Sequence, residues 1–233
     1  MTPLQLQRAV QHEPYLARMF EILRASPRPV MVEAGACDGY HTKIFNAAVA
    51  GIEQHCFEPD PRNSVVISMD KELSSLINVD GPVHLLTAAL GNVTGRVPFH
   101  LATREPNGAC GASSLSALTP ALTEAHPWLR EERVIEVQSY RFDDFIELRG
   151  LPHVDLMWLD VQGSERLVFE GIGWRARRVR WIFTEYDAGY ADSRSLPELL
   201  AQLNALPGQS SPEPWRVAME VPGNALLANT GAL

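Results

Sequence analysis

The chain has few cysteines, no long apolar run and no excess of positive charge, and each lack excludes a class of protein. Its three cysteines are an odd number without metal-type spacing, so we expect reduced thiols rather than a disulfide framework or a zinc site. No stretch reaches the ~18–20 apolar residues needed to span a bilayer. The net charge of −8 argues against non-specific binding to nucleic acid or acidic membranes. We therefore expect a cytoplasmic protein with no nucleic-acid partner and no membrane partner.

A dinucleotide-binding Gly-x-Gly-x-x-Gly loop is also absent, which disfavours a nicotinamide-dependent oxidoreductase. Instead, the apolar residues 30–32 lead through Glu33 to Gly35 and Gly39, and helix-compatible residues follow. This pattern is typical of a buried strand, a tight loop and a helix, in which glycines let the backbone approach a ligand. Glu33 would repel a phosphate. It suits a ligand with hydroxyl and ammonium groups, such as S-adenosylmethionine.

Strand-like and helix-like segments alternate along the 233 residues. Strands are predicted at residues 30–33, 55–58, 83–90, 97–101, 133–140, 154–160, 179–185, 215–221 and 225–229, and helices at about 40–50, 62–77, 141–146, 164–172 and 196–206. A helical segment, 1–29, precedes a core, 30–233, and we expect the two to form a single domain. The alternation predicts an α/β fold, with a doubly wound, mostly parallel sheet, helices on both faces and a C-terminal antiparallel hairpin.

Carboxylates follow the predicted strands at Glu33, Glu58, Asp160 and Glu185. The carboxyl ends of parallel strands meet at one edge of a sheet, where ligands bind. Glu58 ends the strand after the glycine loop, and a carboxylate there can accept both hydroxyls of a ribose. Taken alone, Glu58 would be a surface acid before a proline turn. Together, these residues predict a nucleoside pocket.

Methyl transfer to oxygen requires a group that takes up the hydroxyl proton, and the candidates are Asp160, Glu165 and His41. Each has a structural alternative. Asp160 would serve as a helix N-cap, Glu165 as a first-turn acid on the helix dipole, and His41 as a surface or packing residue. No metal site is predicted, although Asp160, Glu165 and Glu185 would form an oxygen site if they converged.

Several segments, in order and spacing, carry a resemblance to a known family. They are Val32–Tyr40, Phe57–Asp60, Ala88–Gly91 with Gly95, Ser113–Leu115, Leu159–Glu165, Phe169–Gly171 and Ile182–Glu185. From about residue 30 to residue 186 the chain resembles the FkbM-type S-adenosylmethionine-dependent methyltransferases. The resemblance implies a class I (Rossmann-like) methyltransferase fold, S-adenosylmethionine as cofactor, and methylation of a hydroxyl on a small molecule, sugar or glycan. The cofactor-binding residues expected with it are Glu33, Gly35, Ala36, Asp38, Gly39, Glu58, Pro59, Ala89 and Asp160.

Three positions depart from the family pattern, which usually has aspartate in place of Glu33, lysine in place of Trp158 and glutamate in place of Gln162. A compensated exchange, a different acceptor, or a site that binds cofactor without turnover would each explain the last two. A catalytically silent S-adenosylmethionine-binding module is therefore the alternative function. The Gly- and Ser-rich loop 106–120 is expected to cover the cofactor or acceptor, with a plain surface loop as the alternative. The sequence specifies neither the acceptor nor the oligomeric state.

Overall fold

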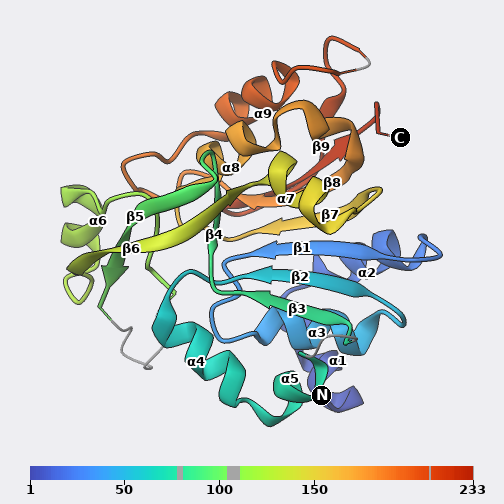
Figure 1. Cartoon of the computed structure of the whole chain (residues 1–233), viewed down its shortest axis with the longest axis horizontal. Helices are drawn as coiled ribbons and strands as arrows, with labels where there is room; N and C mark the ends of the chain where they lie inside the picture. The colour runs from blue at the N-terminus through green and yellow to red at the C-terminus, as the bar shows by residue number, and fades with distance from the viewer. Residues whose placement is uncertain (78–80, 104–110, 210, 233) are drawn as a thin grey trace.

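The computed structural model describes residues 1–77, 81–103, 111–209 and 211–232. The strands of its larger sheet are β1 (Val30–Ala34), β2 (Glu53–Phe57), β3 (Val83–Leu86), β7 (Val154–Leu159), β8 (Val179–Glu185), β9 (Trp215–Val221) and β10 (Asn224–Asn229). Their order is β3-β2-β1-β7-β8-β10-β9 (Figure 1). The first five are parallel, and β10 runs antiparallel to both β8 and β9. The strand order reverses between β1 and β7, which is where doubly wound sheets bind ligands.

Helices cover both faces of this sheet, because the strands are apolar on both sides. One face is covered by α1 (Pro3–His12), α2 (Leu16–Arg24) and α3 (Tyr40–Ala48), and the other by α7 (Phe142–Arg149), α8 (Glu165–Ile172) and α9 (Leu196–Asn204). Side chains alternate along β1, so Met31 packs with the first group and Val32 with the second. The predicted doubly wound α/β fold is confirmed.

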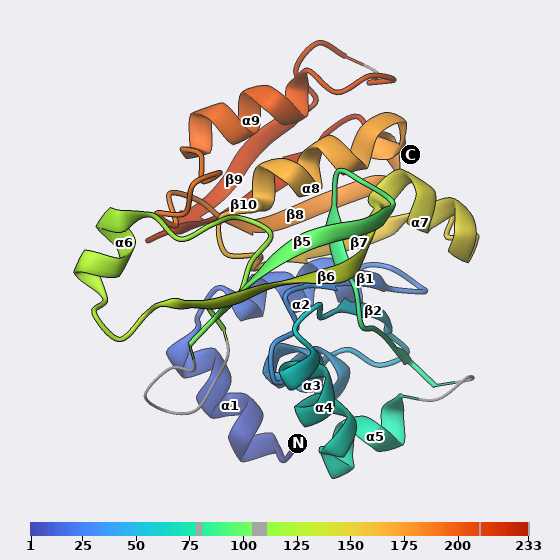
Figure 2. The ribbon, with the colours of Figure 1, turned by 60° about the vertical axis from the view of Figure 1, so that its left-hand side comes forward.

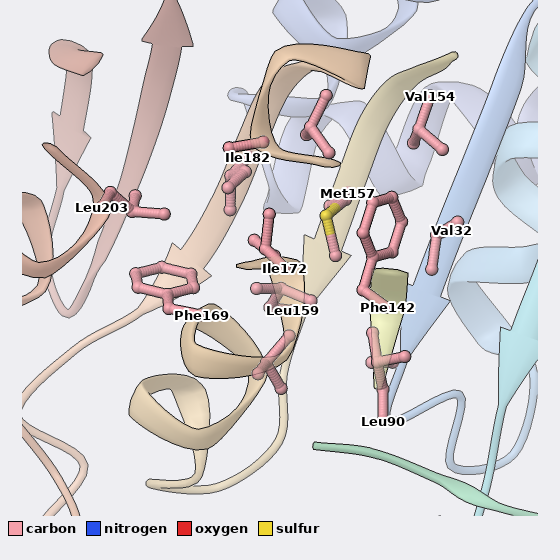
Figure 3. Packing of buried hydrophobic residues seen from close by; sticks show 14 of the residues in the cluster. Val32, Leu90, Phe142, Val154, Met157, Leu159, Phe169, Ile172, Ile182 and Leu203 are labelled. Atoms are coloured by element: carbon pink, nitrogen blue, oxygen red, sulfur yellow. The ribbon is translucent and has the colours of Figure 1, made fainter. Parts of the chain in front are cut away.

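The larger core lies between the sheet and helices α7–α9, as Figure 3 shows. Burying one such apolar side chain contributes about 1.5–3 kcal/mol. The fully buried members from both layers include Val32, Met157, Phe142, Phe169, Ile172 and Leu203. This packing holds the ends of β1 and β7 side by side, and so fixes the place where the site is built.

A second, three-stranded sheet was not predicted from the sequence. It contains β4 (Ala89–Gly91), β6 (Glu131–Arg141) and β5 (Gly95–Ala102), in that order, and α6 (Pro120–Ala125) lies beyond one end of it (Figure 2). The single strand expected over residues 83–90 was wrong. The chain turns after Leu86, whose carbonyl accepts the N–H groups of both Glu58 and Ala88, and then enters the second sheet.

The helix expected over residues 62–77 is two helices, α4 (Pro61–Met69) and α5 (Lys71–Leu76). Asp70 breaks it, because its Oδ1 accepts the N–H groups of Glu72 (2.9 Å) and Leu73 (3.0 Å) and so caps α5. The C-terminal hairpin, β9 and β10, is confirmed. Among the described residues, no helix has the length and apolar character that crossing a membrane requires.

Candidate active site

An open cavity of about 200 Å³ lies at the carboxyl ends of β1, β2 and β7. Its wall includes five of the expected cofactor-binding residues, namely Gly35, Glu58, Pro59, Ala89 and Asp160. The cavity therefore lies at the edge where the sequence predicts a ligand.

Gly35 lets the loop after β1 lie directly against the end of β7. Its φ is +88°, and a Cβ placed there would lie 1.8 Å from the carbonyl oxygen of Asp160. Its N–H donates to the carbonyl of Phe57 at 3.0 Å. A side chain is excluded by both conformation and space, so the cavity is bounded here by bare backbone.

Glu58 joins the glycine loop to the start of α4. Its Oε2 accepts the N–H of Cys37 at 2.7 Å, and its Oε1 accepts the N–H of Asp60 at 2.8 Å. Burial raises the pKa of Glu58 to about 8, although these hydrogen bonds oppose the shift. The side chain of Asn63 also hydrogen-bonds to Glu58, and a carboxylate has about four acceptor sites, so Glu58 retains the capacity to accept a ligand hydroxyl.

Glu33 is buried and is not part of the described cavity wall. Its Oε2 accepts hydrogen bonds from Thr42 Oγ1 (2.6 Å) and Cys56 Sγ (3.4 Å), and burial raises its pKa.

Asp38 and Gly39, like Glu33, lie outside the cavity wall. Oδ1 of Asp38 accepts the N–H of Tyr40 at 2.9 Å, and a Cβ at Gly39 would meet Leu73 of α5. Ala36 is buried outside it too. Cofactor contacts for these four residues stay a prediction.

Gln162 links two acids at the ends of β7 and β8. Its side-chain amide donates to Oδ1 of Asp160 at 2.6 Å and to Oε2 of Glu185 at 3.3 Å. Burial raises the pKa of Asp160, and burial followed by the charge of Asp160 raises the pKa of Glu185 to about 7. Tyr190 in turn donates to Oε1 of Gln162 at 3.3 Å. The amide at position 162 therefore holds a pair of carboxyl groups together on one side of the cavity.

Glu165, at the start of α8, is buried behind this pair. Its Oε1 accepts the N–H of Gly163 at 3.3 Å. Burial raises its pKa to about 8, and the charges of Glu185 and Asp160 add to the shift. Glu165 is not part of the described cavity wall, so its catalytic role stays a prediction. In the described part of the chain, the oxygens of Asp160, Glu165 and Glu185 do not all come within 4.8 Å of one another.

His41 lies beside the cavity, on the first turn of α3. Its contacts were not predicted from the sequence. Its Nε2 is 2.9 Å from Oε2 of Glu13, which also accepts the hydroxyl of Tyr15 at 2.7 Å. Its ring contacts Trp158 with centroids 4.6 Å apart. Burial alone would lower the pKa of His41, but Glu13, Glu33 and Asp160 together raise it. The turn between α1 and α2 therefore contacts His41, although no sequence motif marks this contact and neither Glu13 nor His41 belongs to the described cavity wall.

The described part of the predicted cover loop forms one wall of the cavity. Gly111, Ser113 and Leu115 line it, whereas residues 106–110 of that prediction fall outside the described residues. Ser113 Oγ donates to Oδ2 of Asp60 at 2.9 Å, and Ser114 Oγ donates to the carbonyl of Gln162 at 2.8 Å. These bonds fix the loop to both sides of the cavity.

Comparisons with known proteins agree with this architecture. The model of the methyltransferase FkbM domain family matches residues 33–206. The 2-O-methyltransferase NoeI of Sinorhizobium fredii (strain NBRC 101917 / NGR234) is 30% identical over 218 residues, covering 91% of this chain and 84% of that protein. A crystal structure of methyltransferase FkbM from Methylobacillus flagellatus KT matches with a TM-score of 0.45 and 15% identity. That match covers 86% of this chain, which spans 43% of the other. On the extent of the family match and the identity to NoeI, the chain is a methyltransferase and belongs to the FkbM methyltransferase family.

Proposed function

We propose that this methyltransferase uses S-adenosylmethionine and methylates a hydroxyl group of a small molecule, sugar or glycan. The observation that carries the proposal is the cavity at the ends of β1, β2 and β7, with Gly35 and Glu58 on its wall. The name of NoeI, a 2-O-methyltransferase, supports oxygen as the atom that is methylated.

The chemistry of the cavity fits this cofactor. Gly35 places bare backbone on the cavity wall, because a side chain there would meet the carbonyl of Asp160, and Glu58 on the same wall can accept a ribose hydroxyl. The carboxyl groups of Asp160 and Glu185 lie on the same side and complement a ligand that carries positive charge. When bound, S-adenosylmethionine supplies a methyl group on a positively charged sulfur, which transfers to a nucleophilic oxygen as the carbon–sulfur bond breaks.

The protein must position the acceptor and take up its hydroxyl proton. Asp160 is the candidate base that lines the cavity, while Glu165 and His41 lie next to it. A general base works best when its pKa is near the working pH, and burial moves the carboxyl groups of Asp160, Glu165 and Glu185 in that direction. We assign proton uptake to Asp160 first, with Glu165 and His41 as the other candidates.

Calorimetric titration with S-adenosylmethionine and S-adenosylhomocysteine tests the cofactor, with NADH as the negative control. We expect saturable binding of the first two only. If neither ligand produces heat or raises the melting temperature, the proposal is wrong.

Transfer of radiolabelled methyl groups to a panel of hydroxyl compounds, including oligosaccharides, tests the reaction. We expect a methyl ether product whose formation is lost in Asp160→Asn but retained in Asp144→Asn, which changes an exposed acid. Cofactor binding without product from any acceptor would instead favour the silent binding module, for which Trp158 and Gln162 are the motivation.

A further inference from the structure

Three metal-ligating side chains meet on β2 and β3, away from the candidate active site. Glu53 and His55 are two residues apart on β2, so their side chains emerge on the same face of the sheet. His84 is the register partner of His55 on the neighbouring parallel strand. Among the described residues, this is the one group of at least three His, Cys, Asp or Glu side chains whose ligand atoms all lie within 4.8 Å of one another.

The spacing of the three donor atoms fits a small divalent cation. Oε1 of Glu53 lies 2.9 Å from Nε2 of His55 and 3.8 Å from Nε2 of His84. A tetrahedral zinc ion with bonds of about 2.0–2.2 Å needs donors about 3.3–3.5 Å apart. The two measured separations bracket this value. Two imidazole nitrogens and one carboxylate oxygen, with a fourth position left to water, are also a donor set that zinc accepts.

His55 is held in place by the residues packed around it. It is fully buried, and its ring packs edge-on against Phe145 of α7 with centroids 5.4 Å apart. Binding of a metal through Nε2 requires the tautomer with its proton on Nδ1, so that Nε2 presents its lone pair.

His84 and Glu53 are half-buried, so an ion can reach them from solvent. The ring of His84 stacks on that of His55, with centroids 4.8 Å apart and an interplanar angle of 18°. A metal held by both Nε2 atoms requires His84 to turn out of this stack.

We propose that Glu53, His55 and His84 form a binding site for a divalent transition-metal cation, zinc in particular, that cross-links β2 to the edge strand β3. Glu53 lies at the start of β2, four residues before Phe57 and so about 13 Å from the cavity end of the strand. The ion is structural and takes no part in methyl transfer. The proposal is independent of the cofactor and of the acceptor.

Titration of chelator-treated full-length protein with ZnCl2 by calorimetry, and with CoCl2 by visible absorption, tests the site. We expect one Zn²⁺ per chain and Co²⁺ bands typical of tetrahedral coordination. His84→Ala and Glu53→Gln each remove one ligand and should weaken Zn²⁺ binding by at least about tenfold. His126→Ala, which changes an exposed histidine outside the cluster, should leave it unchanged. His55 is too deeply buried to serve as the test position.

Arg149, at the end of α7, provides a test of opposite sign. Its charge lowers the pKa of both histidines and also opposes a bound cation. Arg149→Gln should therefore tighten Zn²⁺ binding. Zn²⁺ should also raise the melting temperature of the wild-type protein but not that of His84→Ala. The proposal is overturned if no saturable Zn²⁺ binding occurs, or if His84→Ala and Glu53→Gln both bind Zn²⁺ as tightly as the wild type.

Discussion

Glu13 and His41 come from segments that precede and follow β1, yet Oε2 of one lies 2.9 Å from Nε2 of the other. This carboxylate stabilises the protonated imidazole. Glu13→Gln removes its charge, so the pKa of His41 should fall and the ring should lose its proton at a lower pH. Titration of the ring nitrogens by ¹H–¹⁵N NMR measures this directly, without cofactor or acceptor.

The matched control is Glu21→Gln, which changes an exposed glutamate of α2. This variant should leave the pKa of His41 at its wild-type value. If His41 accepts the hydroxyl proton, Glu13→Gln should also move the acidic limb of the kcat/KM profile to lower pH. An identical His41 titration in Glu13→Gln and wild type would mean that the contact does not form in solution.

Replacement of Glu58 should weaken cofactor binding more than it affects folding. Glu58→Gln keeps the shape of the side chain but replaces one acceptor oxygen with a donor, which matches a ribose poorly. A hydrogen bond between uncharged groups contributes about 0.5–1.5 kcal/mol, so we expect S-adenosylhomocysteine to bind roughly 2- to 10-fold more weakly. Calorimetry measures this, with Glu124→Gln on α6 as the control. Equal affinity in both variants would exclude Glu58 from the cofactor site.

Gly35→Ala should cost more stability than Gly51→Ala. Both glycines have positive φ, but a Cβ at Gly51 meets nothing within 4 Å, whereas one at Gly35 meets the Asp160 carbonyl at 1.8 Å. Left-handed backbone costs about 1–2 kcal/mol for a residue other than glycine. Denaturant unfolding should show that cost in Gly51→Ala and a clearly larger loss in Gly35→Ala. Equal losses would mean that the loop after β1 does not press against β7.

The buried acids predict a stability that falls as the pH rises from about 4.5 to 8. The pKa of Glu165 is about 8 in the folded protein, against 4.5 for an exposed glutamate, so the folded state binds this proton more tightly. The stabilisation is complete below pH 4.5 and is lost as the pH passes 8, at about 1.4 kcal/mol per pKa unit at most. Glu185 acts in the same direction with a pKa of about 7.

Melting temperatures measured across this pH range test whether Glu165 causes the decline in stability. The variant is Glu165→Gln, and the control is Glu136→Gln, which changes an exposed strand residue. Glu165→Gln should flatten the decline, because an amide has no proton to lose. A decline equally steep in both variants would contradict the assignment to Glu165.

The sequence was most informative where strand, loop and glycine follow one another directly. The residues around Gly35 and Glu58 could be placed on one rim because a parallel strand fixes where its carboxyl end lies. Glu13 and Tyr15 could not be placed there from the sequence. They precede β1, whereas His41, which contacts Glu13, follows it. The proximity of His84 to His55 was missed for a similar reason, because it depends on the register between β2 and β3. The turn at Leu86 was hidden because no glycine, proline, asparagine or aspartate interrupts residues 83–90.

Several of the hydrogen bonds at the cavity join main chain to main chain. The N–H of Gly35 bonds to Phe57, and the N–H of Asp160 bonds to the carbonyl of Ala34 at 3.0 Å. Such bonds tolerate changes of neighbouring side chains. Engineering of acceptor preference should therefore vary Ser113 and Leu115, which line the cavity. The part of the cavity beside Gly35 is expected to keep its shape when neighbouring side chains are substituted.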